Sequence, residues 1–302
     1  MENAAQQNPD PGRRLPDFLV IGAAKSGTST LHHLLDQHPG IYMSAVKEPC
    51  FFDVDVGWSR GWSWYHDLFD PASSNQLCGE SSTNYTRIPQ VSGVPERIHA
   101  AMPDVKLIYL MRHPVDRAYS HYVHRVSREL YQGQPVRLSF EEFAEQDPMC
   151  LDSSDYKTQI EAYFARFPRE AFLFLLTSDL KSPARLMSRV GPFLGLEPCE
   201  LNEGVGVSNA NVDFHEGKVR QMLTAPLQRA PRLRKLVRLL PQSIRDGAYQ
   251  LLRRSHYGKR VSDRYTPAPM RPETRARLID HFLPSIEFVR DELDLDVDSW
   301  LV

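Results

Sequence analysis

Blocks of apolar and polar positions alternate along the first two thirds of the chain, in an order typical of strands that each precede a helix. Short apolar runs bounded by polar residues predict buried strands, and longer segments with apolar residues three or four positions apart predict helices. We expect strands at residues 17–21, 41–43, 77–80, 105–111 and 171–176, and helices at residues 28–37, 94–101, 114–128, 154–167 and 182–194. This order predicts an α/β fold with a central, mostly parallel sheet flanked by helices.

The last third of the chain has a different pattern, dominated by basic residues. Between Lys218 and Arg260 there are twelve lysines and arginines and a single acid, Asp246, with leucines at helical spacing between the charges. Three interpretations stay open: a pair of amphipathic helices with a solvated face, a positive lid over an anionic ligand, or a weak contact with a membrane surface. A last helix is expected at residues 271–292.

Composition is that of an ordinary globular protein. The 302 residues are 41% hydrophobic and 25% charged, with a formal net charge of −2, so any anion site is local and nucleic acid is not an expected partner. We predict a disordered leader at residues 1–15 and one domain at 16–302, with a basic helical region at about 216–264. No apolar run reaches the length of a transmembrane helix and no signal peptide is recognisable, which favours a cytoplasmic location.

Cysteine usage gives no indication of a metal site. The chain has four cysteines, and none of them forms a C-x-x-C pair or another spacing typical of metal ligands. We therefore expect reduced, structural thiols and no bound metal.

The first motif with chemical content is an apolar strand that runs directly into a loop rich in Gly, Lys, Ser and Thr. Residues 18–30 read FLVIGAAKSGTST. Such a junction directs backbone N–H groups and a helix N-terminus to one point, which suits a phosphate. In an ATP-type P-loop the lysine follows the second glycine, whereas here the lysine precedes the glycine by two positions. The loop therefore predicts a different phosphate site, with these candidate ligands: Lys25, Ser26, Gly27, Thr28, Ser29 and Thr30.

The second motif follows the strand expected at residues 105–111. Arg112 stands at the carboxyl end of that strand, where α/β folds bind ligands, and Ser120 lies eight residues further along the chain, in the next helix. An arginine fork and a hydroxyl together suit a terminal phosphate. The R-x-P-x-x-R-x-x-S pattern taken alone also fits a structural strand–helix junction. Paired with the first loop, it supplies the second end of a bis-phosphorylated nucleotide.

With these two motifs the chain resembles the sulfotransferases that use 3′-phosphoadenosine 5′-phosphosulfate (PAPS). The resemblance extends from Pro16 to Trp300 and is strongest to the carbohydrate branch, which includes the heparan sulfate glucosaminyl enzymes, and to related bacterial enzymes. Residues 47–53, KEPCFFD, are similar to the K-E-P-x-F-F segment of that branch. Residues 79–85, GESSTNY, are similar to its G-E-K-T-P-x-Y segment, and residues 94–98 match V-P-E-R-I. The resemblance implies a P-loop-like three-layer fold with a central sheet.

The resemblance also implies roles for single residues in a direct in-line transfer from PAPS to a hydroxyl of a carbohydrate or small metabolite. The loop at residues 25–30 would hold the 5′-phosphosulfate, with Lys25 stabilising the leaving phosphate. Arg112 and Ser120 would bind the 3′-phosphate, and Glu48 would be the general base. A C-terminal loop that closes on the nucleotide in the family is only loosely matched here, by Lys259 and Arg260.

Several of these roles have alternatives. Glu48 also fits an ordinary surface loop, and Glu80 is a second carboxylate that either orients the loop lysine or assists the acceptor. His113 is a further candidate base, although its place beside Arg112 favours a structural or phosphate-side role. Tyr85 is an acceptor-side candidate, and so is Trp62, whose aromatic neighbours favour packing on the core.

One departure from the family pattern bears on the substrate. Ser81 stands where the G-E-K-T-P segment has a lysine, which argues against a glycosaminoglycan acceptor. Two other function classes compete with the sulfotransferase. A P-loop kinase or NTPase would need Mg²⁺ and a lysine after Gly27, and a non-catalytic nucleotide or polyanion binder would use the basic C-terminal stretch.

Overall fold

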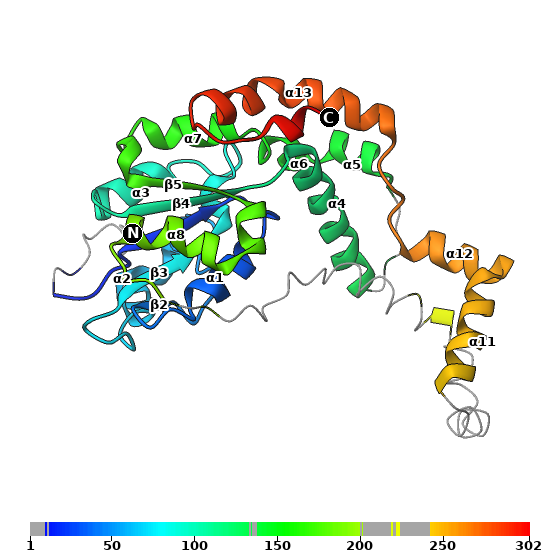
Figure 1. Ribbon diagram of the computed structural model, residues 1–302, viewed down its shortest axis with the longest axis horizontal. Helices are drawn as coiled ribbons and strands as arrows, with labels where there is room; N and C mark the ends of the chain where they lie inside the picture. Colours follow the sequence, from blue (N-terminus) through cyan, green and yellow to red (C-terminus); the bar gives the residue numbers. More distant parts are fainter. Residues whose placement is uncertain are drawn as a thin grey trace. The chain divides into compact units, whose positions relative to one another are not determined.

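The structure is a computed structural model (Figure 1), and it describes residue 10 and residues 12–132, 134, 138–199, 201, 219, 222–223 and 242–302. At its centre lies a five-stranded sheet in which all paired neighbours are parallel, in the order β2-β3-β1-β4-β5. The strands are β1 (Phe18–Gly22), β2 (Ile41–Met43), β3 (Leu77–Ser81), β4 (Lys106–Met111) and β5 (Phe172–Leu176). Each lies within one or two residues of its predicted position, so the expected parallel α/β fold is confirmed.

Helices connect these strands. All the helices expected from the hydrophobic pattern are present, and their ends differ from the prediction by at most a few residues. The α-helices are α1 (Thr28–Leu35), α2 (Gly61–Asp67), α3 (Val94–Ala101), α4 (Pro114–Tyr131), α5 (Phe140–Gln146), α6 (Met149–Asp152), α7 (Tyr156–Phe164), α8 (Pro183–Leu194), α11 (Gln242–Arg254), α12 (His256–Tyr265) and α13 (Pro272–Asp291). Short 3₁₀ helices are η2 (Trp58–Arg60), η3 (Thr83–Thr86), η4 (Arg169–Ala171), η5 (Thr177–Lys181) and η6 (Asp298–Leu301). None of the helices described here combines the length and apolar character needed to span a membrane.

Helix α5 was not expected from the apolar pattern, but its first turn contains a clear start signal. The Ser139 hydroxyl accepts a hydrogen bond from the Glu142 backbone, and the Glu142 carboxylate accepts one from the Ser139 backbone. This reciprocal arrangement is a capping box, which satisfies two N–H groups that a helix start would otherwise leave unpaired.

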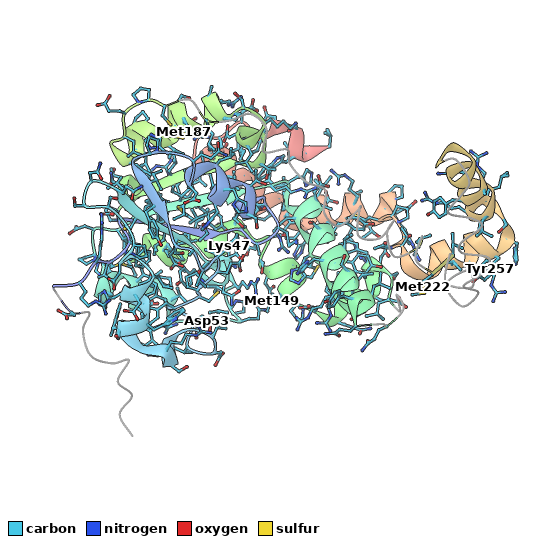
Figure 2. The ribbon with its side chains drawn as sticks, turned by 90° about the horizontal axis from the view of Figure 1, so that it is seen from below. Lys47, Asp53, Met149, Met187, Met222 and Tyr257 are labelled. Atoms are coloured by element: carbon cyan, nitrogen blue, oxygen red, sulfur yellow. The ribbon has the colours of Figure 1, made fainter. Side chains whose placement is uncertain are left out.

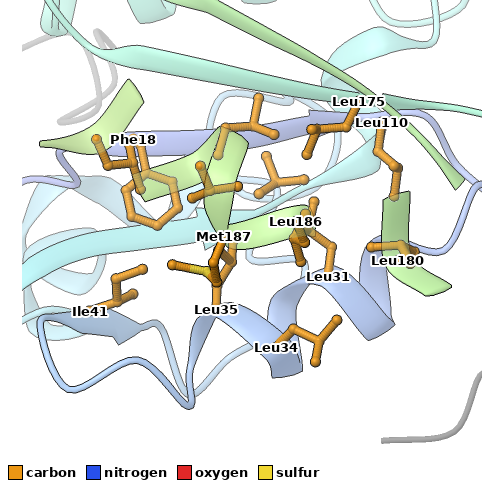
Figure 3. Packing of buried hydrophobic residues seen from close by; sticks show 14 of the residues in the cluster. Phe18, Leu31, Leu34, Leu35, Ile41, Leu110, Leu175, Leu180, Leu186 and Met187 are labelled. Carbon is orange, nitrogen blue, oxygen red and sulfur yellow. The ribbon is translucent and has the colours of Figure 1, made fainter. Parts of the chain in front are cut away.

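The sheet is covered on both faces, which explains why its strands are almost continuously apolar. On one face, α1 and α8 pack against β1, β4 and β5 through the cluster shown in Figure 3, where Leu31 and Leu35 of α1 meet Leu186 and Met187 of α8. On the other face, Tyr156 of α7 packs edge-on against Tyr109 of β4. Helix α13 adds to this layer, since Ser285 accepts a hydrogen bond from the α7 backbone. The three-layer prediction is confirmed.

The chain forms two compact units. The first comprises residues 1–118, 148–207 and 275–302, and it contains the whole sheet. The second comprises residues 119–147 and 208–274, with most of α4 together with α5, α11 and α12. Inside the second unit, Tyr122 of α4 packs against Phe140 and Phe143 of α5. Much of the predicted basic region at residues 216–264 lies outside the described residues, and its described part contains the helices α11 and α12.

Candidate functional site

The loop between β1 and α1 has the backbone of an anion site. Lys25 and Gly27 both adopt positive φ angles, 72° and 100°, so the chain turns sharply before α1 begins. Glycine suits position 27 for two reasons. The left-handed backbone of Gly27 favours glycine, and a Cβ there would lie 2.7 Å from Leu180 Cδ1, so the leucine side chain would have to shift. The Ala23 N–H donates to the Leu110 carbonyl at 2.8 Å, which ties the loop to β4. The N–H groups in the first turn of α1 lack partners within the helix, so they can donate hydrogen bonds to an anion bound at the loop.

The other loop residues differ in their exposure. Ser26 and Thr28 are buried, whereas Ser29 is exposed on the first turn of α1 and Thr30 is half-buried beside it. The Ser26 carbonyl accepts a hydrogen bond from the Thr177 hydroxyl at 2.8 Å, which attaches the loop to the end of β5. The loop is therefore held from two neighbouring strands, as a preorganised binding site requires.

Positive side chains gather around this loop. Burial lowers the pKa of the half-buried Lys25 amine; the Glu48 carboxylate opposes that shift, and the nearby charges of Arg117, Lys47 and Arg112 add to it. Among the described residues, no hydrogen bond or ion pair engages the Lys25 amine or the Arg112 guanidinium. Two cations at the carboxyl ends of the adjacent strands β1 and β4 are thus available to a ligand.

Arg117 is a buried cation behind the loop that the sequence reasoning did not single out. Its guanidinium is fully buried and donates to the Ser154 hydroxyl and to the carbonyls of Cys150 and Ala24, the last at 3.4 Å. No carboxylate pairs with it among the described residues. Because an unpaired buried charge is unfavourable, a bound anion at the loop would compensate for it. The signal was present in the sequence, since Arg117 is the second arginine of R-x-P-x-x-R.

Glu48 lies on the loop that follows β2, where Lys47 and Asp53, both labelled in Figure 2, belong to the same segment. Its carboxylate accepts hydrogen bonds from the Lys47 amine at 2.8 Å and from the Thr83 hydroxyl at 3.1 Å. The Glu48 N–H donates to the Ser81 carbonyl at 3.0 Å, which pins the loop to the end of β3. The side chain is 35% exposed and electrostatically coupled to Lys25. A carboxylate therefore faces the cationic loop and remains accessible, as a base acting on a bound acceptor requires.

The buried positions of Glu80 and Tyr85 do not fit the prediction that they contact an acceptor. Both side chains are fully buried, and the Tyr85 hydroxyl donates to Glu80 Oε1 at 2.7 Å. Tyr65 and Ser82 donate to the same carboxylate, at 3.1 and 2.8 Å. With three hydroxyl donors and no solvent access, Glu80 holds the segment after β3 in place from behind. Burial raises its pKa to about 7.

The raised pKa of Glu80 predicts how stability depends on pH. The folded state binds this proton more tightly than the unfolded chain, whose carboxyl has the ordinary value of 4.5. Stability from this group is therefore full at acidic pH and declines as the pH rises from about 4.5 to about 7, by about 3 kcal/mol at 1.36 kcal/mol per unit. Glu80→Gln removes this dependence. Urea unfolding at pH 5 and pH 8 should show the variant gaining stability relative to the parent at the higher pH, and parallel behaviour of the two proteins would contradict the assignment.

The position of Trp62 does not fit the predicted role in acceptor binding either. It is 9% exposed and lies within a cluster of rings, with Phe51 at 4.7 Å and Trp58 at 5.9 Å between ring centroids. Phe51 in turn stacks on Tyr65 at 4.2 Å. The cluster joins α2 to the segment after Glu48, which agrees with the interpretation of these aromatic residues as core packing.

The remaining predicted residues lie in other settings. His113 is buried, its Nδ1 is hydrogen-bonded to the Val115 N–H and its Nε2 lies 3.2 Å from the Arg275 guanidinium, which supports the structural interpretation. Ser120 is half-buried on α4, in the part of that helix that belongs to the second unit. Lys259 and Arg260 are exposed within α12, so they belong to a helix where the resemblance implied a loop. The binding roles of these last three residues stay predictions.

Comparison with known proteins decides the family. Residues 15–224 match the sulfotransferase domain, which is more than half of the chain. The chain belongs to the sulfotransferase family. This membership confirms the resemblance inferred from the motifs.

Several sulfotransferases are similar to part of this chain or to most of it. The human bifunctional heparan sulfate N-deacetylase/N-sulfotransferase 3 is 33% identical over 204 residues, which cover 61% of this chain and 23% of that protein. The human heparan sulfate glucosamine 3-O-sulfotransferase 6 is 34% identical over 197 residues, covering 62% of this chain and 54% of the relative. The chain thus spans about half or less of these curated relatives. A sulfotransferase structure from Alicyclobacillus acidocaldarius shares the fold, with a TM-score of 0.66, 22% identity and coverage of 95% of this chain and 99% of the other.

Proposed function

We propose that this sulfotransferase moves the sulfuryl group of PAPS to a hydroxyl of a carbohydrate or small-molecule acceptor by direct in-line transfer. The observation that carries the proposal is the pairing of two cations, Lys25 and Arg112, that no described residue engages, at adjacent strand ends with the accessible carboxylate of Glu48. The names of the heparan sulfate relatives favour a carbohydrate acceptor. Ser81 stands where the G-E-K-T-P-x-Y pattern has a lysine, and this difference favours a carbohydrate acceptor other than a glycosaminoglycan.

Each residue has a distinct task in this reaction. PAPS supplies a sulfuryl group bound to a phosphate that can leave. Glu48 accepts the proton of the acceptor hydroxyl as the new O–S bond forms, and Lys25 donates to the oxygen that gains charge as the old S–O bond breaks. The loose transition state of such transfers places most of the demand on positioning and on charge stabilisation, which side chains and backbone N–H groups supply. Activity in EDTA is therefore expected.

Arg112 should set the preference for the 3′-phosphate. Replacing it by alanine removes charge-assisted hydrogen bonds worth about 1.5–3 kcal/mol, so the affinity for 3′-phosphoadenosine 5′-phosphate should fall about 10- to 100-fold. Adenosine 5′-phosphate lacks the 3′-group, and its affinity should change less than about twofold on the same scale. Calorimetric titration in EDTA, with ATP as a third ligand, measures all three affinities. Equal weakening of 3′-phosphoadenosine 5′-phosphate and adenosine 5′-phosphate would remove Arg112 from the 3′ site. Preferential binding of ATP by the parent protein would overturn the proposed function.

A further inference from the structure

The carboxylate of Glu48 is held by two donors of different character. Lys47 is its neighbour in the chain and reaches Oε1 with a flexible, 25% exposed side chain. Thr83 reaches Oε2 from another element, the 3₁₀ helix η3, and is 2% exposed. A β-branched side chain that is buried has little rotational freedom, so the Thr83 hydroxyl is the more rigid of the two donors.

The helix that carries Thr83 is itself firmly anchored to the sheet. At its far end, the Thr86 hydroxyl donates to the Ile21 carbonyl of β1 at 2.9 Å. Just before it, the Ser82 hydroxyl accepts from the Cys50 N–H at 2.9 Å and donates to buried Glu80. The position of the Thr83 hydroxyl is therefore determined by β1, from which the cationic loop continues, and by Glu80 of β3.

This contact involves a position at which the chain departs from the quoted family pattern. Aligned letter by letter, residues 79–85 place Thr83 where the G-E-K-T-P-x-Y pattern has proline, which carries no hydroxyl. The contact does not follow from membership of the family, and it stands beside a second departure, Ser81 in place of lysine.

We propose that Thr83 is a positioning residue that orients the Glu48 carboxylate toward the acceptor. The inference rests on the proposed function, in which Glu48 is the base. The Thr83 hydroxyl holds Glu48 Oε2 in one orientation, and the second lone pair of that oxygen stays available for the acceptor proton.

The test is the turnover of Thr83→Val and Thr83→Ser. Valine keeps the shape and removes the donor, so kcat should fall about 3- to 10-fold, in line with one hydrogen bond, while KM for PAPS changes less than about twofold. Serine restores the hydroxyl and should restore kcat.

Thr86→Val is the matched control, because it makes the same change in the same helical turn where the hydroxyl bonds a backbone carbonyl. It should keep kcat within about twofold of the parental value. In a Glu48→Gln background, Thr83→Val should cause no further loss of kcat. An unchanged kcat in Thr83→Val, or an equal loss of kcat in both backgrounds, would overturn the positioning role. Full turnover of Glu48→Gln itself would instead overturn the assignment of the base.

Discussion

Lys25→Ala should reduce the turnover of PAPS by about 10²–10³-fold, the effect of removing one well-placed donor to a developing charge. The half-buried amine lies on a loop held by β4 and β5, and no group among the described residues engages it. Its burial makes each interaction with a bound anion stronger than it would be in water. Single-turnover measurements at saturating acceptor report the loss directly.

A matched substitution separates this effect from a general loss of charge. Lys157→Ala removes an exposed lysine on α7 that pairs with Glu161 in the next turn, and turnover should stay at the parental value. If Lys25→Ala retained more than about a third of parental turnover, well outside the range typical of such donors, the loop lysine would have no role in stabilising the leaving group.

Glu48→Gln should lower kcat by about 10²–10⁴-fold, the usual contribution of a positioned base. Glutamine has nearly the same shape, and its one carbonyl oxygen can accept the hydrogen bond of either Lys47 or Thr83, but it cannot take a proton from the acceptor. Affinity for 3′-phosphoadenosine 5′-phosphate should change only a few-fold on this reasoning. Steady-state kinetics together with calorimetry distinguish the two effects.

Glu96→Gln serves as the control for this prediction. Glu96 is an exposed carboxylate on α3 that pairs with Arg166, and the variant should turn over like the parent protein. A Glu48→Gln variant that lost nucleotide affinity in proportion to kcat would indicate that Glu48 shapes the binding site rather than acting as the base.

Local patterns predicted most of the fold because the core strands are buried on both sides. The run of apolar residues in β4 and β5 has no polar face, which is typical of a parallel sheet and rarely occurs elsewhere in a globular protein. Helix α5 lacked such a signal from apolar spacing alone, and its presence depends on a cap formed by Ser139 and Glu142.

The sequence by itself determined the sulfotransferase family, the parallel α/β sheet, and the cationic loop with its lysine before the glycine. These features depend on neighbours in the chain: an apolar strand, a left-handed glycine and the start of a helix. The tertiary structure alone decided which of the candidate side chains are buried and which stay accessible. Glu48 and Glu80 are the same residue type in the sequence. In the structure, however, Glu80 is enclosed by three hydroxyl donors, while Glu48 remains accessible beside Lys25. Burial and hydrogen bonding between distant segments create that difference, because β2 and β3 meet only once the sheet has formed.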